Sequence, residues 1–270
     1  MQKRQASSFY PHFEQAERPT IDYFVGLFNR LMFQQEPILT DFLNPRERSI
    51  LQTVVGGEAF LDEFGGFKQA ERKRVWLTSE WTSHQFDEFE VAPFEIKYPS
   101  KFAQLSHGAI MGTLANAGIE LKSFGDIITD GKGRWQFFAK AELTDFFLDE
   151  IQRIGSTKVK LNLIDWKEVL TPEDESVEDT IVAASMRVDA ILAAASKHSR
   201  KQIQEDVNSQ LVKLNWHNLA ESNIIVNIGD VISLRHFGRV QVMSVATTKK
   251  GKFKVVLKLW RTKGHKRKIG

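Results

Sequence analysis

Residues 187–216 have the sequence RVDAILAAASKHSRKQIQEDVNSQLVKLNW, and this stretch decides the fold of the C-terminal part of the chain. Val188, Ile191 and Leu192 have the spacing of one helix face, and Ser199 is a suitable N-cap for a second helix. Residues 211–216 then have the pattern of a short strand. The stretch therefore predicts two short helices followed by a strand.

The residues after this stretch predict a small sheet. Turn residues separate three further strand-forming runs, at 231–234, 240–245 and 253–260. Gly251 lies in the turn between the last two runs, where a tight hairpin needs positive φ. We therefore expect a small domain over 181–246, followed by a basic C-terminal strand and tail over 247–270 that forms a basic β-hairpin with it.

Charge is distributed unevenly along the 270 residues. The formal net charge is only +3, yet no acidic residue follows Asp230, and the last 40 residues contain twelve basic ones. The first 230 residues contain 25 basic and 34 acidic residues, a net charge of −9. A basic end of this kind is typical of proteins that bind polyanions such as RNA. A solvated basic tail is the alternative, but these residues alternate with strand-forming apolar ones.

The first 170 residues predict a helical region over 1–70 and a mixed domain over 71–170. Apolar residues from Ile21 to Met32 repeat at helical spacing after a Thr20 cap, and Asn44 is placed to cap a second helix. The mixed domain has the order strand, helix, strand, strand, helix, strand, which is that of a ferredoxin-like or RRM-like βαββαβ fold. An acidic linker is expected over 171–180. The predicted fold class is therefore α+β.

Composition and motifs give no indication of an enzyme. The chain has no cysteine, which excludes disulfides and thiolate metal sites and is typical of a reducing cytoplasm. It has no run of about 18 apolar residues, and its first eight residues are polar, so we expect neither a membrane span nor a secretory signal. No two of the seven histidines have metal-ligand spacing, and no nucleophile elbow is present. We therefore expect no catalytic residue, metal or cofactor.

The mixed domain also lacks the base-stacking pattern of RNA-binding sheets. Residues 132–138 begin like the aromatic strand motif of such sheets. The positions that should stack on bases hold Arg134 and Gln136, however. Trp135 and Phe137 share the other face, and we expect that face to be the core.

Residues 187–240 closely resemble the RNA-binding domain named after small-subunit ribosomal protein S-four, in which two packed helices join a small twisted sheet. The resemblance implies one positive surface for RNA phosphates, and a helix N-terminus flanked by basic residues suits a phosphate. The family usually has Gly before the strand at 212–215. Here Gln210 stands there, so we expect Asn208 to build the turn. Carried over residue by residue, the implied RNA contacts are Arg187, Ser199, Arg200, Lys201, Lys213, Asn215, Arg235 and Arg239.

Motifs along most of the chain resemble the bacterial YlmH family. They include Tyr10-Pro11-His12-Phe13, Leu105-Ser106-His107-Gly108, Gly125-Asp126-Ile127-Ile128 and Phe237-Gly238-Arg239. The resemblance implies a cytoplasmic, non-catalytic protein that binds ribosomal RNA of the large subunit, beside tRNA, in the rescue of stalled translation. We expect a monomer. Two alternatives stay open: an RNA-modifying enzyme of the pseudouridine synthase or methyltransferase type, and a cell-division interaction factor.

Overall fold

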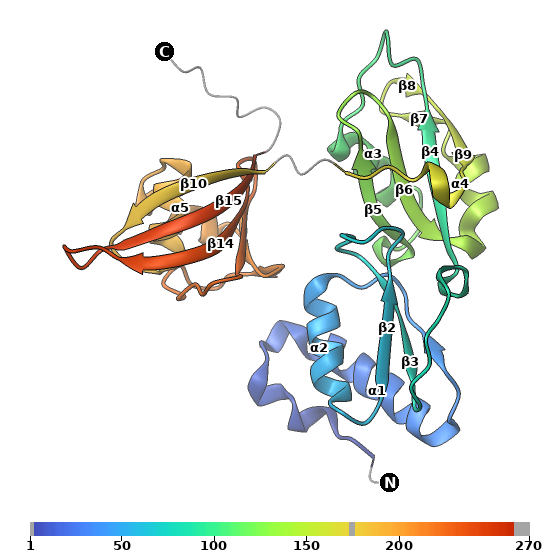
Figure 1. Ribbon diagram of the computed structural model, residues 1–270, viewed down its shortest axis with the longest axis horizontal. Helices are drawn as coiled ribbons and strands as arrows, with labels where there is room; N and C mark the ends of the chain where they lie inside the picture. Colours follow the sequence, from blue (N-terminus) through green and yellow to red (C-terminus); the bar gives the residue numbers. More distant parts are fainter. Residues whose placement is uncertain (1–2, 173–175, 262–270) are drawn as a thin grey trace. The chain divides into compact units, whose positions relative to one another are not determined.

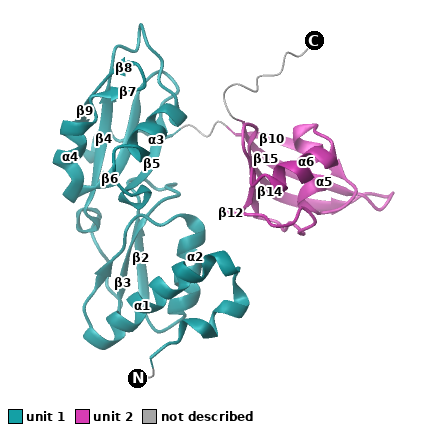
Figure 2. Ribbon diagram, turned by 180° about the vertical axis from the view of Figure 1, so that it is seen from behind, with its two compact units in different colours: residues 1–173 teal, residues 174–270 magenta. Residues whose placement is uncertain are grey.

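The computed structural model describes residues 3–172 and 176–261. The chain forms two compact units, unit 1 over residues 1–173 and unit 2 over residues 174–270 (Figure 2). Both combine helices with antiparallel sheets, in agreement with an α+β fold class. Residues 262–270, which hold four basic residues of the predicted tail, lie outside the described residues.

The N-terminal part of unit 1 packs two helices against a three-stranded sheet of order β1-β3-β2 (Figure 1). Three single 3-10 turns precede them, at Ala6–Ser8, Tyr10–His12 and Gln15–Glu17. The main elements are α1 (Arg18–Gln34), β1 (Ile38–Leu39), α2 (Pro45–Val55), β2 (Phe60–Phe64) and β3 (Arg74–Thr78). The helix face predicted from spacing is confirmed, because Ile21, Phe24 and Leu31 are buried.

The helical region predicted for residues 1–70 is wrong at its end. Residues 60–64 form β2, which pairs with β3 and therefore takes its conformation from a partner more distant in sequence. β3 lies beyond residue 70 but belongs to the same sheet, so this part of unit 1 extends to Thr78. The Asn44 cap is confirmed by hydrogen bonds of 2.9 and 3.0 Å to its side chain. Thr20 is not a cap, because α1 already begins at Arg18.

The second part of unit 1 is a four-stranded antiparallel sheet of order β5-β6-β4-β9. β6 lies between β4 and β5, which is the arrangement of a split βαβ unit. Four 3-10 turns lie at Phe86–Phe89, Leu121–Ser123, Ala141–Leu143 and Trp166–Glu168. The other elements are β4 (Val91–Lys97), α3 (His107–Ala115), β5 (Phe124–Thr129), β6 (Trp135–Lys140), α4 (Thr144–Glu150), β7 (Arg153–Ile154), β8 (Thr157–Lys158) and β9 (Lys160–Leu163).

One face of this sheet packs on α3 and α4. Phe94, Phe137 and Phe147 are fully buried there, and the rings of Phe94 and Phe137 stack with centroids 4.9 Å apart. Trp135 packs against the same cluster. The prediction that Trp135 and Phe137 belong to the core is therefore confirmed.

Unit 2 packs two helices on a six-stranded antiparallel sheet of order β10-β15-β14-β13-β11-β12. The predicted helix faces are confirmed, since Ile191, Leu192 and Ile203 are fully buried. The elements are β10 (Val177–Ala183), α5 (Val188–Ser196), α6 (Arg200–Asn208), β11 (Val212–Leu214), β12 (His217–Asn218), β13 (Val231–Leu234), β14 (Gly238–Thr247) and β15 (Phe253–Arg261).

Two predicted boundaries in this part of the chain differ from the structure. β10 begins at Val177, inside the predicted linker 171–180, because Val177 pairs with Leu259 of β15. β15 lies between β10 and β14, so the basic hairpin is part of the six-stranded sheet and not an addition after residue 246. Both differences arise from pairing between strands about 80 residues apart, which local composition does not reveal.

The turn between α6 and β11 is built by Gln210. This residue has a left-handed backbone, with φ 57°, and its amide donates to the Val207 carbonyl at 2.9 Å. Asn208 is the last residue of α6, so the expectation that Asn208 builds the turn is wrong. Gln210 takes the conformation for which glycine is normally favoured.

Candidate nucleic-acid interface

Two of the predicted RNA-binding arginines are held by one buried carboxylate. The Asp189 side chain is fully buried at the start of α5, and we call Asp189 with Arg187 and Arg200 the Asp189 cluster. Arg187 donates Nε and Nη2 to the two carboxylate oxygens at 3.1 and 2.9 Å. Arg200 donates Nη2 to Oδ1 at 2.8 Å. The arginine side chains remain 37% and 47% exposed, so the cluster presents two guanidinium groups to solvent.

The protonation of Asp189 depends on these arginines. Burial alone raises the pKa of the Asp189 carboxyl, but the hydrogen bonds from Arg200 and Arg187 outweigh it and hold the pKa below its ordinary value. The carboxylate is therefore charged at neutral pH. With two cations for one anion, the cluster keeps an excess positive charge, and its side chains are ordered before any ligand arrives.

The start of α6 places two more predicted residues beside this cluster. Ser199 caps the helix, because its hydroxyl oxygen accepts from the Gln202 amide at 3.1 Å. Lys201 follows Arg200 in the first turn and is exposed. Unsatisfied backbone amides at a helix start carry partial positive charge, so this end of α6 favours an anion such as a phosphate.

Lys213 and Arg239 lie on the sheet and not at the helix starts. Lys213 pairs with Ser233, and Ser233 pairs with Arg239, so the three side chains face the same side of neighbouring strands. The row continues to Trp260, which pairs with Arg239. The ammonium of Lys258 lies 5.1 Å from the centre of the Trp260 ring. This row forms a basic face with an aromatic ring, on the side of the sheet away from the buried core.

Asn215 and Arg235 lie outside the Asp189 cluster and outside the basic row on the sheet. The Asn215 amide group donates to Asp230 Oδ1 at 2.8 Å and accepts from the Val231 amide at 2.9 Å. Its side chain therefore holds the loop before β13 to the end of β11. Arg235 is exposed in the turn after β13, where its backbone amide donates to the Leu211 carbonyl at 2.9 Å. The structure thus joins Arg187 with Arg200, and Lys213 with Arg239, as two separate groups.

Comparison with known proteins identifies the family. A family model described as "Putative RNA-binding domain in YlmH" matches residues 84–168, which contain the β5-β6-β4-β9 sheet. The chain is 34% identical over 252 residues to "Ribosome-associated protein quality control protein P2" of Bacillus subtilis (strain 168), with 92% of this chain and 97% of that protein covered. This chain belongs to the YlmH family. A solved structure named "Cell division protein ylmH from Streptococcus pneumoniae" is 31% identical, with a TM-score of 0.51, and covers 60% of this chain and 99% of its own.

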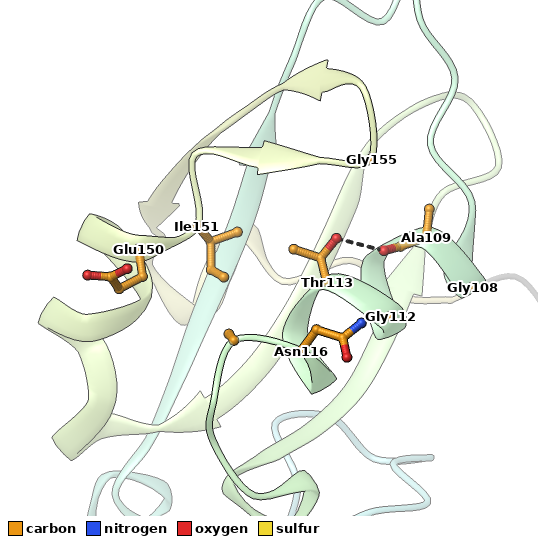
Figure 3. A pocket seen from close by; sticks show the side chains of 9 residues that line it. Gly108, Ala109, Gly112, Thr113, Asn116, Glu150, Ile151 and Gly155 are labelled. Atoms are coloured by element: carbon orange, nitrogen blue, oxygen red, sulfur yellow. Dashed lines mark hydrogen bonds between the residues drawn. The ribbon is translucent and has the colours of Figure 1, made fainter.

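The matched region of this YlmH-family protein contains a hollow beside α3, of about 480 Å³ (Figure 3). Small residues such as Gly108 and Gly112 form much of its wall. Thr113 donates its hydroxyl to the Ala109 carbonyl of the same helix at 2.9 Å, and Glu150 is the one titratable residue of the lining. The lining therefore does not contain a nucleophile next to a base.

The described parts of this YlmH-family chain offer neither a metal site nor a membrane span. Within residues 3–172 and 176–261, no group of three or more histidine, aspartate or glutamate side chains is arranged to hold a metal ion. No helix in these ranges has both the length and the apolar character needed to cross a membrane. The basic side chains of unit 2 described above form one candidate nucleic-acid site.

Asp189 is the residue of this site that the sequence alone did not single out. A signal for it exists in retrospect, because an acidic residue stands at the second helical position, two residues after Arg187, where it forms the centre of the cluster. Lys258 and Trp260 were also not assigned to the site, because their place beside Arg239 depends on the pairing of β14 with β15.

Proposed function

We propose that this protein is a non-catalytic RNA-binding protein that binds ribosomal RNA on the large ribosomal subunit and acts, beside tRNA, in the quality control of stalled translation. We further propose that it works in the cytoplasm as a monomer. The names of its relatives support a role on RNA and at the ribosome. Unit 2 would supply the main contact with RNA, through the predicted residues described above.

The observation that carries this proposal is the Asp189 cluster. It places Arg187 and Arg200 at the starts of two consecutive helices, next to Lys201 and the amides of α6. Ordered guanidinium groups bind phosphate oxygens through paired hydrogen bonds and lose little side-chain entropy on binding. Such contacts release counterions from RNA, so the affinity falls as salt concentration rises.

Co-sedimentation of the purified protein with large ribosomal subunits, over a range of salt concentrations, tests the proposal. We expect salt-dependent binding by the wild-type protein. The double variant R200A/K201A should bind more weakly, and the slope of log K against log salt should fall by about one for each phosphate that the variant no longer binds. R30A/K68A is the matched control, since it removes two exposed charges from unit 1.

Two results would overturn the proposal in different ways. If the wild-type protein does not bind the subunits at any salt concentration, the ribosomal role is wrong, and the cell-division interaction factor becomes the better hypothesis. If the wild-type protein binds but R200A/K201A and R30A/K68A bind equally well, the assignment of the site to unit 2 is wrong.

A further inference from the structure

The open face of the β5-β6-β4-β9 sheet in unit 1 is covered by the chain itself. Phe138 of β6 is fully buried there, stacked parallel to Trp166 with ring centroids 6.4 Å apart. Gln136 donates to the Glu168 carbonyl at 2.9 Å and accepts from the Leu170 amide at 2.8 Å. RNA therefore cannot stack on the middle of this sheet, as it does in RRM domains. Any nucleic-acid contact of unit 1 must use another surface.

One end of the same sheet concentrates positive charge. Lys97 ends β4 and pairs with Lys160 at the start of β9, and together with Lys158 they line one hollow of about 660 Å³. The turn between β5 and β6 lies at this end too, because Gln136 pairs with Glu95. We call the basic residues of this region the lysine end; all six are exposed. They are Lys97, Lys101, Lys132, Arg134, Lys158 and Lys160.

The net charge of the lysine end is opposite in sign to the net charge of the rest of unit 1. Residues 1–173 contain 20 basic and 25 acidic residues, a net charge of −5. The lysine end has three acidic neighbours, Glu95, Asp130 and Glu168, so it carries +3 and the remainder of the unit carries −8. Asp130 already accepts from the backbone amides of Lys132 and Arg134, at 2.8 and 3.0 Å. A positive end on an acidic unit attracts polyanions specifically to that end.

Two cations of the lysine end are held in place by a buried carboxylate. The Glu95 side chain is only 5% exposed, and it accepts from Arg134 Nε and Nη2 at 3.1 and 2.9 Å and from Lys97 Nζ at 2.6 Å. The side chains of Arg134 and Lys97 are 47% and 52% exposed. We call these three residues the Glu95 cluster. It repeats in unit 1 the arrangement of the Asp189 cluster in unit 2.

An exposed aromatic side chain lies in the loop that follows Lys97. Phe102 is 90% exposed in the loop between β4 and α3, directly after Lys101. This loop approaches the turn between β5 and β6, since a Cβ placed on Gly133 would lie 3.5 Å from Ser100. Exposed aromatic rings among basic side chains are the usual means of binding unpaired RNA, because every base can stack on a ring.

We propose that the lysine end is a second RNA-binding surface, which binds the phosphates of an unpaired RNA segment and stacks a base on Phe102. The proposal rests on the proposed function and deepens it, because it assigns the contact of unit 1 to one end of its sheet. Lys158 and Lys160 contact phosphates from the hollow, while the Glu95 cluster presents Arg134 in a fixed orientation.

The test uses the full chain and a fluorescent single-stranded RNA of about twelve nucleotides, in the R200A/K201A background that weakens the unit 2 site. K158A/K160A should lower the salt slope by about 1.4, the value for two phosphate contacts with single-stranded RNA. F102A should weaken binding about tenfold at every salt concentration, with an unchanged slope, because stacking is not electrostatic. All three residues are exposed, and equal thermal midpoints would show that the variants fold. The R30A/K68A substitutions, in the same background, are the control.

The results separate this proposal from the proposed function. If K158A/K160A leaves the salt slope unchanged and F102A leaves the affinity unchanged, the lysine end does not bind RNA, whatever the subunit-binding experiment shows. A photo-crosslinking residue in place of Phe102, in protein bound to large subunits, provides a second readout. Crosslinks to RNA support the proposal, whereas crosslinks confined to ribosomal proteins would overturn it in favour of a protein partner.

Discussion

Each compact unit contains one buried carboxylate that holds two exposed cations, but the two clusters are assembled differently. In unit 2, Asp189 bonds to Arg187 and Arg200, which are two and eleven residues away in sequence. In unit 1, Glu95 bonds to Lys97 nearby and to Arg134, which is 39 residues away. The first cluster therefore follows from a local motif, whereas the second exists only because β4 pairs with β6.

The clusters also differ in the chemistry of their cations. Both cations of Asp189 are arginines, and the carboxylate has no exposed surface. Glu95 has one arginine, bound through both carboxylate oxygens, and one lysine bound through a single oxygen. A planar guanidinium fixes its partner more strongly than an ammonium group does. We therefore expect a larger loss of stability when the Asp189 cluster is broken than when the Glu95 cluster is broken.

The largest effect is expected when both arginines of the Asp189 cluster are removed. R187M/R200M should lower the free energy of unfolding of unit 2 by about 3 kcal/mol, because a buried carboxylate is left without a partner. Hydrogen exchange of the α5 and β14 amides would measure this for unit 2 separately. Adding Asp189→Asn should restore most of the loss, since it removes the buried charge. A triple variant as unstable as the double variant would contradict this explanation.

A smaller effect is expected in the Glu95 cluster. R134M should lower the free energy of unfolding of unit 1 by about 2 kcal/mol at pH 7, because Lys97 still pairs with the carboxylate. Hydrogen exchange of the β4 and β6 amides, repeated from pH 7 to pH 2, provides the measurement. A loss as large as that of the arginine pair in unit 2 would show that the two clusters do not differ as described.

The same R134M measurement has a defined pH dependence. The hydrogen bond from Arg134 lowers the pKa of Glu95 from its ordinary 4.5 to about 2, against the effect of burial. As pH falls, the unfolded carboxyl takes up its proton first, so the contribution of the ion pair is complete above about pH 5 and is lost toward pH 2. The difference between wild type and R134M should therefore shrink over this range. A difference that stays constant would indicate a loss of packing and not of charge.

The smallest effect is expected for Lys97. K97A should lower the free energy of unfolding by about 0.5 kcal/mol, because this ammonium is half exposed and Glu95 keeps both bonds to Arg134. Chemical denaturation monitored by circular dichroism would show the change. K201A, which removes an exposed lysine outside both clusters, is the comparison. A loss for K97A that equals the loss for R134M would mean that the lysine is as important as the arginine.

Much of the fold follows from local patterns in the sequence. Helical spacing predicts the buried faces of α1, α5 and α6, and the order of elements predicts the split βαβ arrangement of β4, β5, β6 and β9. Local pattern failed at residues 60–64 and at 177–180, where strands form by pairing with distant partners. It also failed at Gln210, because no residue type in the turn indicates that this residue has a left-handed backbone.

The candidate site, like the fold, is predictable from local sequence only in part. The proposed RNA-binding residues at the helix starts are recognisable from the motif at 187–201, whose spacing is local. The contribution of Asp189 is not, because a sequence does not show that one carboxylate is buried and shared by two arginines. The row of Lys213, Ser233 and Arg239 likewise depends on the register of three strands.

The sequence by itself determined the fold class and the segregation of charge between an acidic front and a basic end, because composition and short-range spacing encode these properties. Its motifs also resemble those of the YlmH family, to which the chain belongs. Tertiary structure decided which cations share an anion, which sheet face is covered and where positive charge gathers within the acidic unit. The reason is physical. Burial, strand register and ion pairing depend on residues that are distant in sequence, such as Glu95 and Arg134, and the folded chain brings them within hydrogen-bond distance.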